Sequence, residues 1–428
     1  MTQVQDNGVV TVLHPICCGL DVHKKFVTAC LIISDATTER SVLETFGTFT
    51  DDLIRLREWL LEHKCPVVAL ESTGVYWKPV HNILEGYLVV LLVNARHIKN
   101  LPGRKTDMSD CQWIATLLRV GFLKASFIPP KIVRQWRDLT RYRRSLVEAL
   151  GDVKRQVHKL LESINIKIDS VVSVLFGKTG RNLMELLIKD KAEITLAEVQ
   201  SCLRGKLKSK CTELFRAVQG FFEEHHRWML QEMLDRVQQH EANLARVESR
   251  LRDLLQPHDE LIGRVTEIPG IAQTSAYAIL SETGTTLESF PNAGAFCSWA
   301  GVCPGNNESA GKRRSTRSPV RGSHLRTHLV EAAWAAVKTK GSYYRSKYFS
   351  LRSRLGPKKA IMAIAHRILK ALYYIIKHGD SFRDLGEDYL TELKKRSITS
   401  YLERQAKKIG MVLLPESMWK LMTHGSPA

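Results

Sequence analysis

Apolar residues near the start of the chain come in short runs of strand length. The runs ICCGLD at 16–21 and FVTACLII at 26–33 lie on either side of a short polar turn, and residues 42–49 alternate between apolar and polar. Runs of this length and composition predict three consecutive β-strands. Because the connections are short, we expect neighbouring strands to pair with one another.

The next segment has the pattern of a strand–helix–strand unit. We expect a helix capped by Asp51 or Asp52 and ending near His63, a strand at 67–71, a helix around 76–85 and a strand at 87–93. Strands separated by helices usually pair in parallel within a buried sheet. The sequence therefore predicts a mixed α/β domain over residues 1–130, ending where Pro129-Pro130 interrupts the pattern.

Residues 131–260 have a helical period instead. Two stripes recur at spacings of three and four and predict long helices: Leu139, Tyr142, Leu146, Ala149, Val153, Val157 and Leu160, then Leu230, Leu234, Val237, Leu244, Val247, Leu251 and Leu254. The stripes fit an antiparallel or dimeric coiled coil and equally the core of an ordinary helical bundle. No clear pattern emerges between residues 165 and 210.

A third, mostly helical region covers residues 261–380. It begins with VTEIPGIAQTSAYAILSETG, in which Pro-Gly and a tight turn precede an alanine-rich helix. Such a segment resembles a helix-hairpin-helix, whose backbone N–H groups can hold a phosphate, but the pattern also suits a plain packing unit. Residues 381–428 form a charged, amphipathic helical tail. The predicted fold class is therefore α/β plus α.

Composition excludes several classes of protein. The chain has 428 residues, of which 44% are hydrophobic and 25% charged, as in globular proteins. No apolar run reaches the roughly 18 residues that span a membrane, and no secretory signal is visible. The nine cysteines include no CxxC pair. This pattern favours a reducing, cytoplasmic setting over a disulfide framework or a zinc ribbon.

Positive charge is concentrated in two blocks. The formal net charge is +19. Residues 1–70 have six Lys or Arg against nine acids, whereas residues 96–159 have fifteen against five and residues 312–359 have fourteen against one. Both basic blocks are interleaved with aromatic residues, which indicates surfaces that bind a polyanion such as nucleic acid. A solvated basic face is the alternative.

Four acids are placed where a metal site would need them. Asp21 and Glu71 end predicted strands, and Asp107 and Asp110 are three residues apart at a predicted helix start. Spacing of three puts both on one helical face. Clustered carboxylates repel one another unless a hard cation binds them, and Mg²⁺ suits oxygen ligands and substrate phosphates. Taken singly, each acid could equally be a solvated residue or a helix cap.

A polar loop at 305–311 leads into dense positive charge. The cations that follow are Lys312, Arg313, Arg314, Arg317, Arg321 and Arg326. A serine here could attack phosphorus while arginines neutralise the developing charge. By composition the candidates are Ser309, Ser315, Ser318 and Ser323. By composition alone, a basic nucleic-acid-binding loop with incidental serines is the better explanation.

Three blocks together resemble the IS110-type insertion-sequence transposases, which are DEDD recombinases with a RuvC-like N-terminal domain. The blocks are GLDVHKKF, then ALESTGVYWKPV with RKTDMSDCQWIA, and then IPGIAQTSAYAIL through AFCSWAGVCPGNNESAGKRRSTRSPVRGSHLRTHLVEAAW. They occur in the family's order and take in most of residues 16–125 and 261–340.

The resemblance implies an RNase H-like N-terminal domain, a helical coiled-coil linker and a C-terminal transposase domain. It implies that Asp21, Glu71, Asp107 and Asp110 form a Mg²⁺-binding tetrad. The family's nucleophilic serine lies in a Glu-Ser-Gly segment, which matches Glu308-Ser309-Ala310 here. Arg104 and Lys105 would then hold nucleic acid beside the tetrad.

The resemblance also implies partners. They are donor and target DNA, a structured non-coding guide RNA, and further copies of the chain in a dimer or tetramer. We therefore expect an RNA-guided DNA recombinase that acts in a prokaryotic cytoplasm near the nucleoid. Two alternatives remain: a hydrolytic junction-resolving nuclease on the same tetrad, and a non-catalytic RNA- and DNA-binding scaffold.

Overall fold

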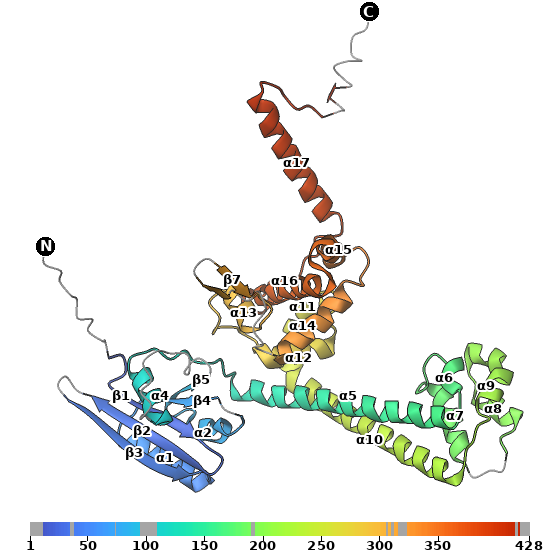
Figure 1. The fold of residues 1–428 in the computed structure, drawn as a ribbon, viewed down its shortest axis with the longest axis horizontal. Helices are drawn as coiled ribbons and strands as arrows, with labels where there is room; N and C mark the ends of the chain where they lie inside the picture. Colours follow the sequence, from blue (N-terminus) through green and yellow to red (C-terminus); the bar gives the residue numbers. More distant parts are fainter. Residues whose placement is uncertain are drawn as a thin grey trace, which may run out of the picture. The chain divides into compact units, whose positions relative to one another are not determined.

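The computed structural model describes nine stretches of the chain. These are residues 12–34, 38–72, 74–94, 109–189, 193–304, 307–309, 312–315, 323–415 and 418–419. The chain divides into two compact units, residues 1–128 and 129–428 (Figure 1). The finer division predicted at residues 260 and 380 stays a prediction.

A five-stranded sheet forms the first unit, in the order β3-β2-β1-β4-β5. Its strands are β1 (Ile16–Val22), β2 (Phe26–Ser34), β3 (Glu39–Gly47), β4 (Val67–Glu71) and β5 (Val89–Val93). The first three pair antiparallel, whereas β4 pairs parallel with both β1 and β5. This mixed sheet confirms the predicted α/β class and the RNase H-like domain.

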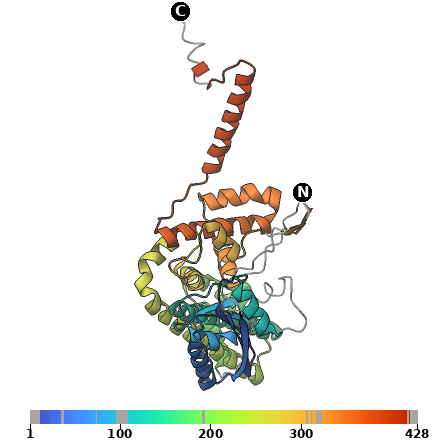
Figure 2. The same cartoon turned by 90° about the vertical axis from the view of Figure 1, so that its left-hand side faces the viewer.

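Helices cover both faces of the sheet (Figures 1 and 2). Helices α1 (Thr50–Glu62) and α2 (Trp77–Leu84) pack on one face, around Leu20, Leu56 and Leu70. Helix α4 (Asp110–Arg119) packs on the other. The sheet is thus buried on both sides, which is why its central strands are almost entirely apolar.

The predicted cap of α1 is wrong. The helix begins after Phe49, which makes no side-chain capping hydrogen bond, and Asp51 and Asp52 lie within the first helical turn. Asp52 instead forms an ion pair with Arg55, one turn further along. Acids in a first turn stabilise a helix through its dipole, so the two aspartates mark the start of the helix without capping it.

Two long antiparallel helices begin the second unit, α5 (Lys131–Ser163) and α10 (Glu224–Leu255) (Figure 1). Ion pairs join Arg143 to Glu248 and Lys154 to Glu241 along their length. The predicted stripe of α5 is only partly right. Its later half is buried as expected, but Tyr142 is 53% exposed, because α5 turns Trp136 and Thr140 inward near its start.

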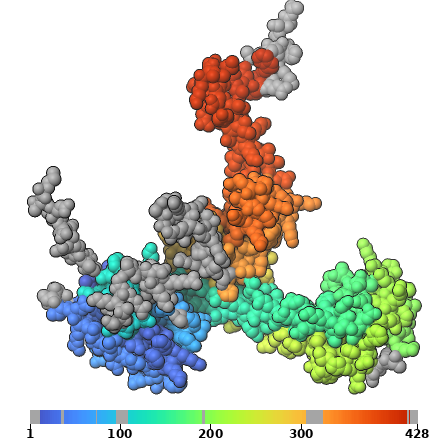
Figure 3. Space-filling view, viewed as in Figure 1, coloured from blue at the N-terminus to red at the C-terminus, as the bar shows by residue number. Residues whose placement is uncertain are grey.

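A small helical head joins the far ends of α5 and α10. It contains α6 (Ile168–Val171), α7 (Lys178–Ile188), α8 (Leu196–Cys202), a 3₁₀ turn (Gly205–Lys210) and α9 (Cys211–Ala217). These helices enclose their own core, which includes Leu183, Val199 and Leu214. Figure 3 shows the head as a knob of packed side chains at one end of the α5–α10 pair.

The rest of the second unit is also mainly helical. Its elements are a 3₁₀ turn (Gln256–His258), α11 (Asp259–Thr266), α12 (Gln273–Thr283), α13 (Ala293–Trp299), β6 (Asn307–Ser309), β7 (Lys312–Ser315), α14 (Ser323–Ala336), α15 (Tyr343–Leu355), α16 (Pro357–His378) and α17 (Tyr389–Lys408). Helix α16 is the central one, packed against α11, α13, α14 and α15. None of the helices in the described stretches is long and apolar enough to span a membrane.

The turn between α11 and α12 acts as a packing unit. Gly270 has φ +88°, and a Cβ there would lie 2.2 Å from the carbonyl oxygen of Ala332 and 2.6 Å from the nitrogen of Ala336. Only glycine permits this approach of two backbones. At this residue the hairpin therefore faces α14, which favours the packing interpretation of the Pro-Gly turn over phosphate binding.

Candidate active site

Asp21 is the last residue but one of β1 and Glu71 is the last residue of β4, and these neighbouring strands are parallel. Leu20 of β1 is in register with Leu70 of β4, so the two acids occupy the next position of each strand. Both leucines are fully buried among α1 and α2, whereas Ala69 belongs to the core beneath α4. Since side chains alternate along a strand, Asp21 and Glu71 both point to the α4 face.

Helix α4 begins close to this sheet edge. A Cβ on Gly19 would lie 2.2 Å from the carbonyl oxygen of Cys111 and 2.5 Å from the nitrogen of Ala115. The missing side chain thus lets the first turns of α4 rest directly on β1, two residues before Asp21. Asp110 is the first residue of this helix and is exposed. Three of the four predicted acids therefore belong to elements that meet at one edge of the sheet.

The buried Cys111 thiol of α4 lies near Asp21. Burial raises the pKa of Cys111, and the negative charge of Asp21 adds to that increase. The Cys111 side chain also contacts the hydroxyl of Ser109 at 3.2 Å. The Asp21 carboxylate is therefore within electrostatic range of the first turn of α4.

A local capping arrangement fixes where α4 begins. The backbone N–H of Ser109 donates to Oε1 of Gln112 at 3.0 Å, and the Ser109 hydroxyl donates to the same oxygen at 2.9 Å. Both bonds run from Ser109 to Gln112, and the first satisfies a backbone N–H that the start of a helix leaves unpaired. This arrangement holds Asp110 at the N-terminal end of the helix, next to the face on which Asp21 and Glu71 lie.

The fourth acid, Asp107, lies outside the described residues, as do Arg104 and Lys105. In the described stretches, no three His, Cys, Asp or Glu side chains are arranged to hold one metal ion. The donor chemistry nevertheless suits Mg²⁺, since Asp21, Glu71 and Asp110 offer only carboxylate oxygens. The predicted tetrad stays a prediction.

His23 is a site residue that the sequence reasoning missed. Its Nε2 lies 3.0 Å from Oδ2 of Asp21, and its ring packs 4.6 Å from that of Phe26. The signal in the sequence was its position two residues after Asp21, just beyond the end of β1. A histidine at this place can fix the orientation of the Asp21 carboxylate.

The serine segment contains a short hairpin where the sequence predicts a loop. Asn307–Ser309 pairs antiparallel with Lys312–Ser315, and Ser309 is opposite Lys312. The backbone thus places Ser309 at the end of β6, with Arg313 and Arg314 on β7. The prediction of a loop was wrong because a strand of three residues is too short to leave a periodic pattern.

Only some of the other candidates of this segment belong to the described residues. Ser318, Arg317 and Arg321 lie outside the described residues. Ser323 is the first residue of α14, and Arg326 follows on the same helix, half-buried.

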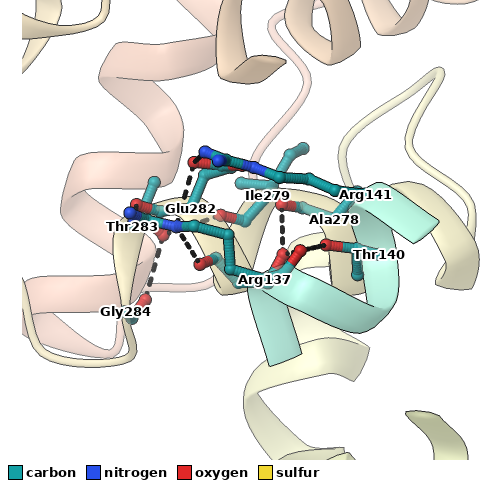
Figure 4. A network of polar contacts seen from close by, with 9 residues as sticks. Arg137, Thr140, Arg141, Ala278, Ile279, Glu282, Thr283 and Gly284 are labelled. Atoms are coloured by element: carbon teal, nitrogen blue, oxygen red, sulfur yellow. Dashed lines mark hydrogen bonds and ion pairs between the residues drawn. The ribbon is translucent and has the colours of Figure 1, made fainter. Parts of the chain in front are cut away.

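Many cations of the first basic block are paired within the protein. Arg137 and Arg141 both bind Glu282 of α12, as Figure 4 shows. The block's other ion pairs join Arg119 to Glu39, Arg143 to Glu248, Arg144 to Glu148 and Glu331, Lys154 to Glu241 and Arg155 to Asp152. The sequence had led us to assign this positive charge to a surface that binds nucleic acid. Much of it instead stabilises the packing of helices.

Comparison with solved structures finds a match over part of the chain. RuvC of T. thermophilus in complex with a Holliday junction substrate matches 26% of this chain and 100% of its own, with 14% sequence identity and a TM-score of 0.21. No curated protein matches the chain.

Comparison with protein families is more informative. Residues 18–166 match a transposase family of the DEDD IS110 type, and residues 263–349 match the transposase IS116/IS110/IS902 family. The first match contains Asp21, Glu71 and Asp110, and the second contains the serine hairpin. On these two matches, the chain belongs to the IS110 family of insertion-sequence transposases.

Proposed function

We propose that this transposase cuts and rejoins donor and target DNA through a covalent serine intermediate. The observation that carries the proposal is the adjacency of Asp21 and Glu71 at the ends of two parallel strands, on the face where α4 begins. A rigid sheet edge of this kind holds carboxylates in a fixed arrangement. Asp107 would complete a tetrad with Asp110.

In the proposed reaction, the Ser309 hydroxyl gives up its proton and its oxygen forms a bond to a DNA phosphorus. The bond from that phosphorus to the leaving sugar oxygen breaks, and this oxygen takes up a proton. One phosphoester replaces another, so attack by a second DNA hydroxyl can restore the strand and release Ser309. In a hydrolytic reaction, water would instead attack the phosphorus, and no phosphoester bond would remain for rejoining the strand.

Bound Mg²⁺ would neutralise phosphate oxygens and stabilise the leaving oxygen. Asp21, Glu71, Asp107 and Asp110 would hold it. Lys312, Arg313, Arg314, Arg317, Arg321 and Arg326 follow Ser309 closely in the sequence. Guanidinium groups donate in a forked geometry that fits phosphate, so these residues would bind the strand around the attacking serine.

The proposal includes two kinds of partner. A structured guide RNA would pair with donor and target DNA, and a second copy of the chain would bring its serine hairpin to the acidic site of the first. The supporting observation is that the acids lie in the first compact unit and Ser309 in the second. A prokaryotic cytoplasm, close to the nucleoid, would provide both the DNA and the reducing conditions that suit nine free cysteines.

The covalent step can be tested by trapping. Wild-type protein incubated with Mg²⁺, guide RNA and labelled DNA should give an SDS-stable protein–DNA species, and Ser309→Ala should give none. Ser315→Ala, on the partner strand of the same hairpin, is the matched control and should still form the adduct. Recombination at the wild-type rate by Ser309→Ala would remove the serine from the mechanism.

The same assay separates the two alternative functions. A hydrolytic nuclease would cut DNA without an adduct, and Ser309→Ala would leave cutting intact. A non-catalytic scaffold predicts that Asp21→Asn leaves the biological output unchanged. The proposed function requires Asp21→Asn to abolish both cutting and adduct formation while nucleic-acid binding persists.

A further inference from the structure

A cavity of about 360 Å³ lies in the second unit between α15, α16 and the segment that follows α16. Its lining includes Tyr343, Tyr344, Arg367, Lys370, Tyr374 and Phe382. A cavity of this volume is within the range that holds a small organic group such as one nucleotide. Its described lining residues come from α15, α16 and that segment.

The cavity presents aromatic rings. Tyr344 and Phe382 are stacked, with ring centroids 6.0 Å apart and an interplanar angle of 21°. Tyr374 is 44% exposed at the cavity and packs against His378 with an interplanar angle of 29°. Exposed tyrosine faces can stack on any nucleobase, because every base has a π-face.

The cavity is also cationic. Arg367, Lys370 and Arg383 line it, against Asp380 and Asp384. Asp384 is already engaged, since its Oδ1 accepts hydrogen bonds from the backbone N–H groups of Tyr343 and Gly386, each at 2.9 Å. Three cations thus face one acid that is not tied to the backbone.

Positive charge extends from the cavity onto neighbouring helices. Burial lowers the pKa of Lys347 on α15, and the nearby cations Arg367, Arg354 and Lys394 lower it further. These residues come from α15, α16 and α17. Within the described stretches, no acid forms an ion pair with Lys347, Arg354 or Arg367. Cations gathered without compensating acids are typical of a surface that binds phosphates.

We propose that this cavity binds one unpaired nucleotide of a single strand, with its base against Tyr374 and its flanking phosphates near Arg367 and Lys370. The strand could be the guide RNA or a DNA strand opened during recombination, since both offer a base and phosphates. This inference rests on the proposed function for its setting. Binding itself requires neither cutting nor the acidic site.

Equilibrium binding of the full chain to labelled oligonucleotides in EDTA tests the proposal. The probes are a 15-nucleotide poly-dT strand, a 15-nucleotide poly-U strand and a DNA duplex of the same length. Tyr374→Ala should raise the Kd for at least one single strand about tenfold, a typical effect of losing one base–aromatic stack. The Kd for the duplex should change less than about twofold, since its bases are already stacked. The probe whose affinity decreases identifies the natural ligand as RNA or as DNA.

A second pair of variants separates stacking from charge. Tyr374→Trp keeps an aromatic face and should restore single-strand binding. For Lys370→Glu, we expect a shallower plot of the logarithm of the binding constant against the logarithm of the salt concentration. Its slope should decrease by about 0.7, the value for one phosphate contact on a single strand. Tyr401→Ala and Lys208→Glu change exposed residues elsewhere in the second unit and should alter neither quantity.

Two results would overturn the inference. One is unchanged single-strand binding by Tyr374→Ala, and the other is equal weakening of single strand and duplex. The proposed function fails separately, on adduct formation. If Ser309→Ala still recombines DNA while single-strand binding depends on Tyr374, the serine mechanism is lost and the nucleotide site remains.

Discussion

Arg141 binds Glu282 through two parallel hydrogen bonds. Its Nε donates to Oε1 at 2.9 Å and its Nη2 donates to Oε2 at 3.0 Å (Figure 4). Arg137 lies 3.1 Å from the same carboxylate and also donates to the carbonyl oxygens of Ser281 and Glu282. The Glu282 side chain is only 8% exposed. One buried acid therefore ties α12 to the start of α5.

Replacing Glu282 should destabilise the second unit. Glu282→Ala removes the carboxylate that Arg137 and Arg141 share and leaves Arg137 only its two carbonyl contacts. Removing one member of a fully buried pair costs about 3–5 kcal/mol, and the partial exposure of both arginines puts this loss at or below the lower end of that range. We expect a clear decrease in the unfolding temperature, measured by circular dichroism. Glu148→Ala removes an exposed i,i+4 pair with Arg144 and should change stability by less than about 0.5 kcal/mol. Equal effects of the two substitutions would contradict a structural role for the buried pair.

Acid should weaken the same region through two histidines of α14. Burial lowers the pKa of His324, and so does nearby Arg141. Burial also lowers the pKa of His328, aided by Arg144. Below pH 6.5, the ordinary pKa of histidine, the unfolded chain binds protons at His324 and His328 more readily than the folded chain does. Stability is therefore retained above that pH and lost as the pH falls through it.

The expected pH effect can be measured on a double variant. Thermal unfolding of the wild type between pH 7.5 and 5.5 should show stability falling by at most about 1.4 kcal/mol per pH unit for each proton. His324→Gln combined with His328→Gln should make that slope shallower, and His225→Gln, an exposed histidine on α10, should not. An unchanged slope in the double variant would show that other groups control acid unfolding.

Gly19 should tolerate no side chain. A Cβ would meet backbone atoms of Cys111 and Ala115, which cannot move without displacing α4. Overpacking of this kind costs about 1–3 kcal/mol, and moving α4 would also move Asp110 away from Asp21. Gly19→Ala should therefore lower both the unfolding temperature and the divalent-metal affinity. Gly263→Ala on α11, where nothing lies within 4 Å, should be neutral or stabilising.

The sequence was most informative where burial leaves a periodic pattern. The strands that carry Asp21 and Glu71 were predicted closely because both faces of β1 and β4 are covered, so their residues are continuously apolar. The parallel pairing of β4 with β5 followed from the intervening helix. The pairing of β1 with β4, which brings the two acids to one end of the sheet, was not predicted, because two strands and a helix separate them in sequence.

Other features depend on contacts that no local pattern records. Arg141 and Glu282 are 141 positions apart, and each looks like an ordinary charged residue of an exposed helix face. The inward turn of Trp136 and Thr140 on α5 depends on α12, which packs there. The aromatic cavity brings together residues from two helices and a connecting segment, each of which is unremarkable in isolation.

His23 offers a test of the acidic site that does not require DNA. Its Nε2 lies 3.0 Å from the Asp21 carboxylate, so its removal should leave that carboxylate less fixed. Loss of a group that orients a ligand typically weakens metal binding about 10- to 100-fold. Calorimetric titration of the full chain with Mn²⁺ should show this decrease in affinity for His23→Ala, and a larger decrease for Asp21→Asn.

The matched control is His63→Ala, which removes a ring that is hydrogen-bonded to the Trp59 carbonyl oxygen at the end of α1. This variant should bind Mn²⁺ like the wild type. Unchanged Mn²⁺ affinity in His23→Ala would show that the sheet alone holds the Asp21 carboxylate. Unchanged Mn²⁺ affinity in Asp21→Asn would show that the metal site does not include β1.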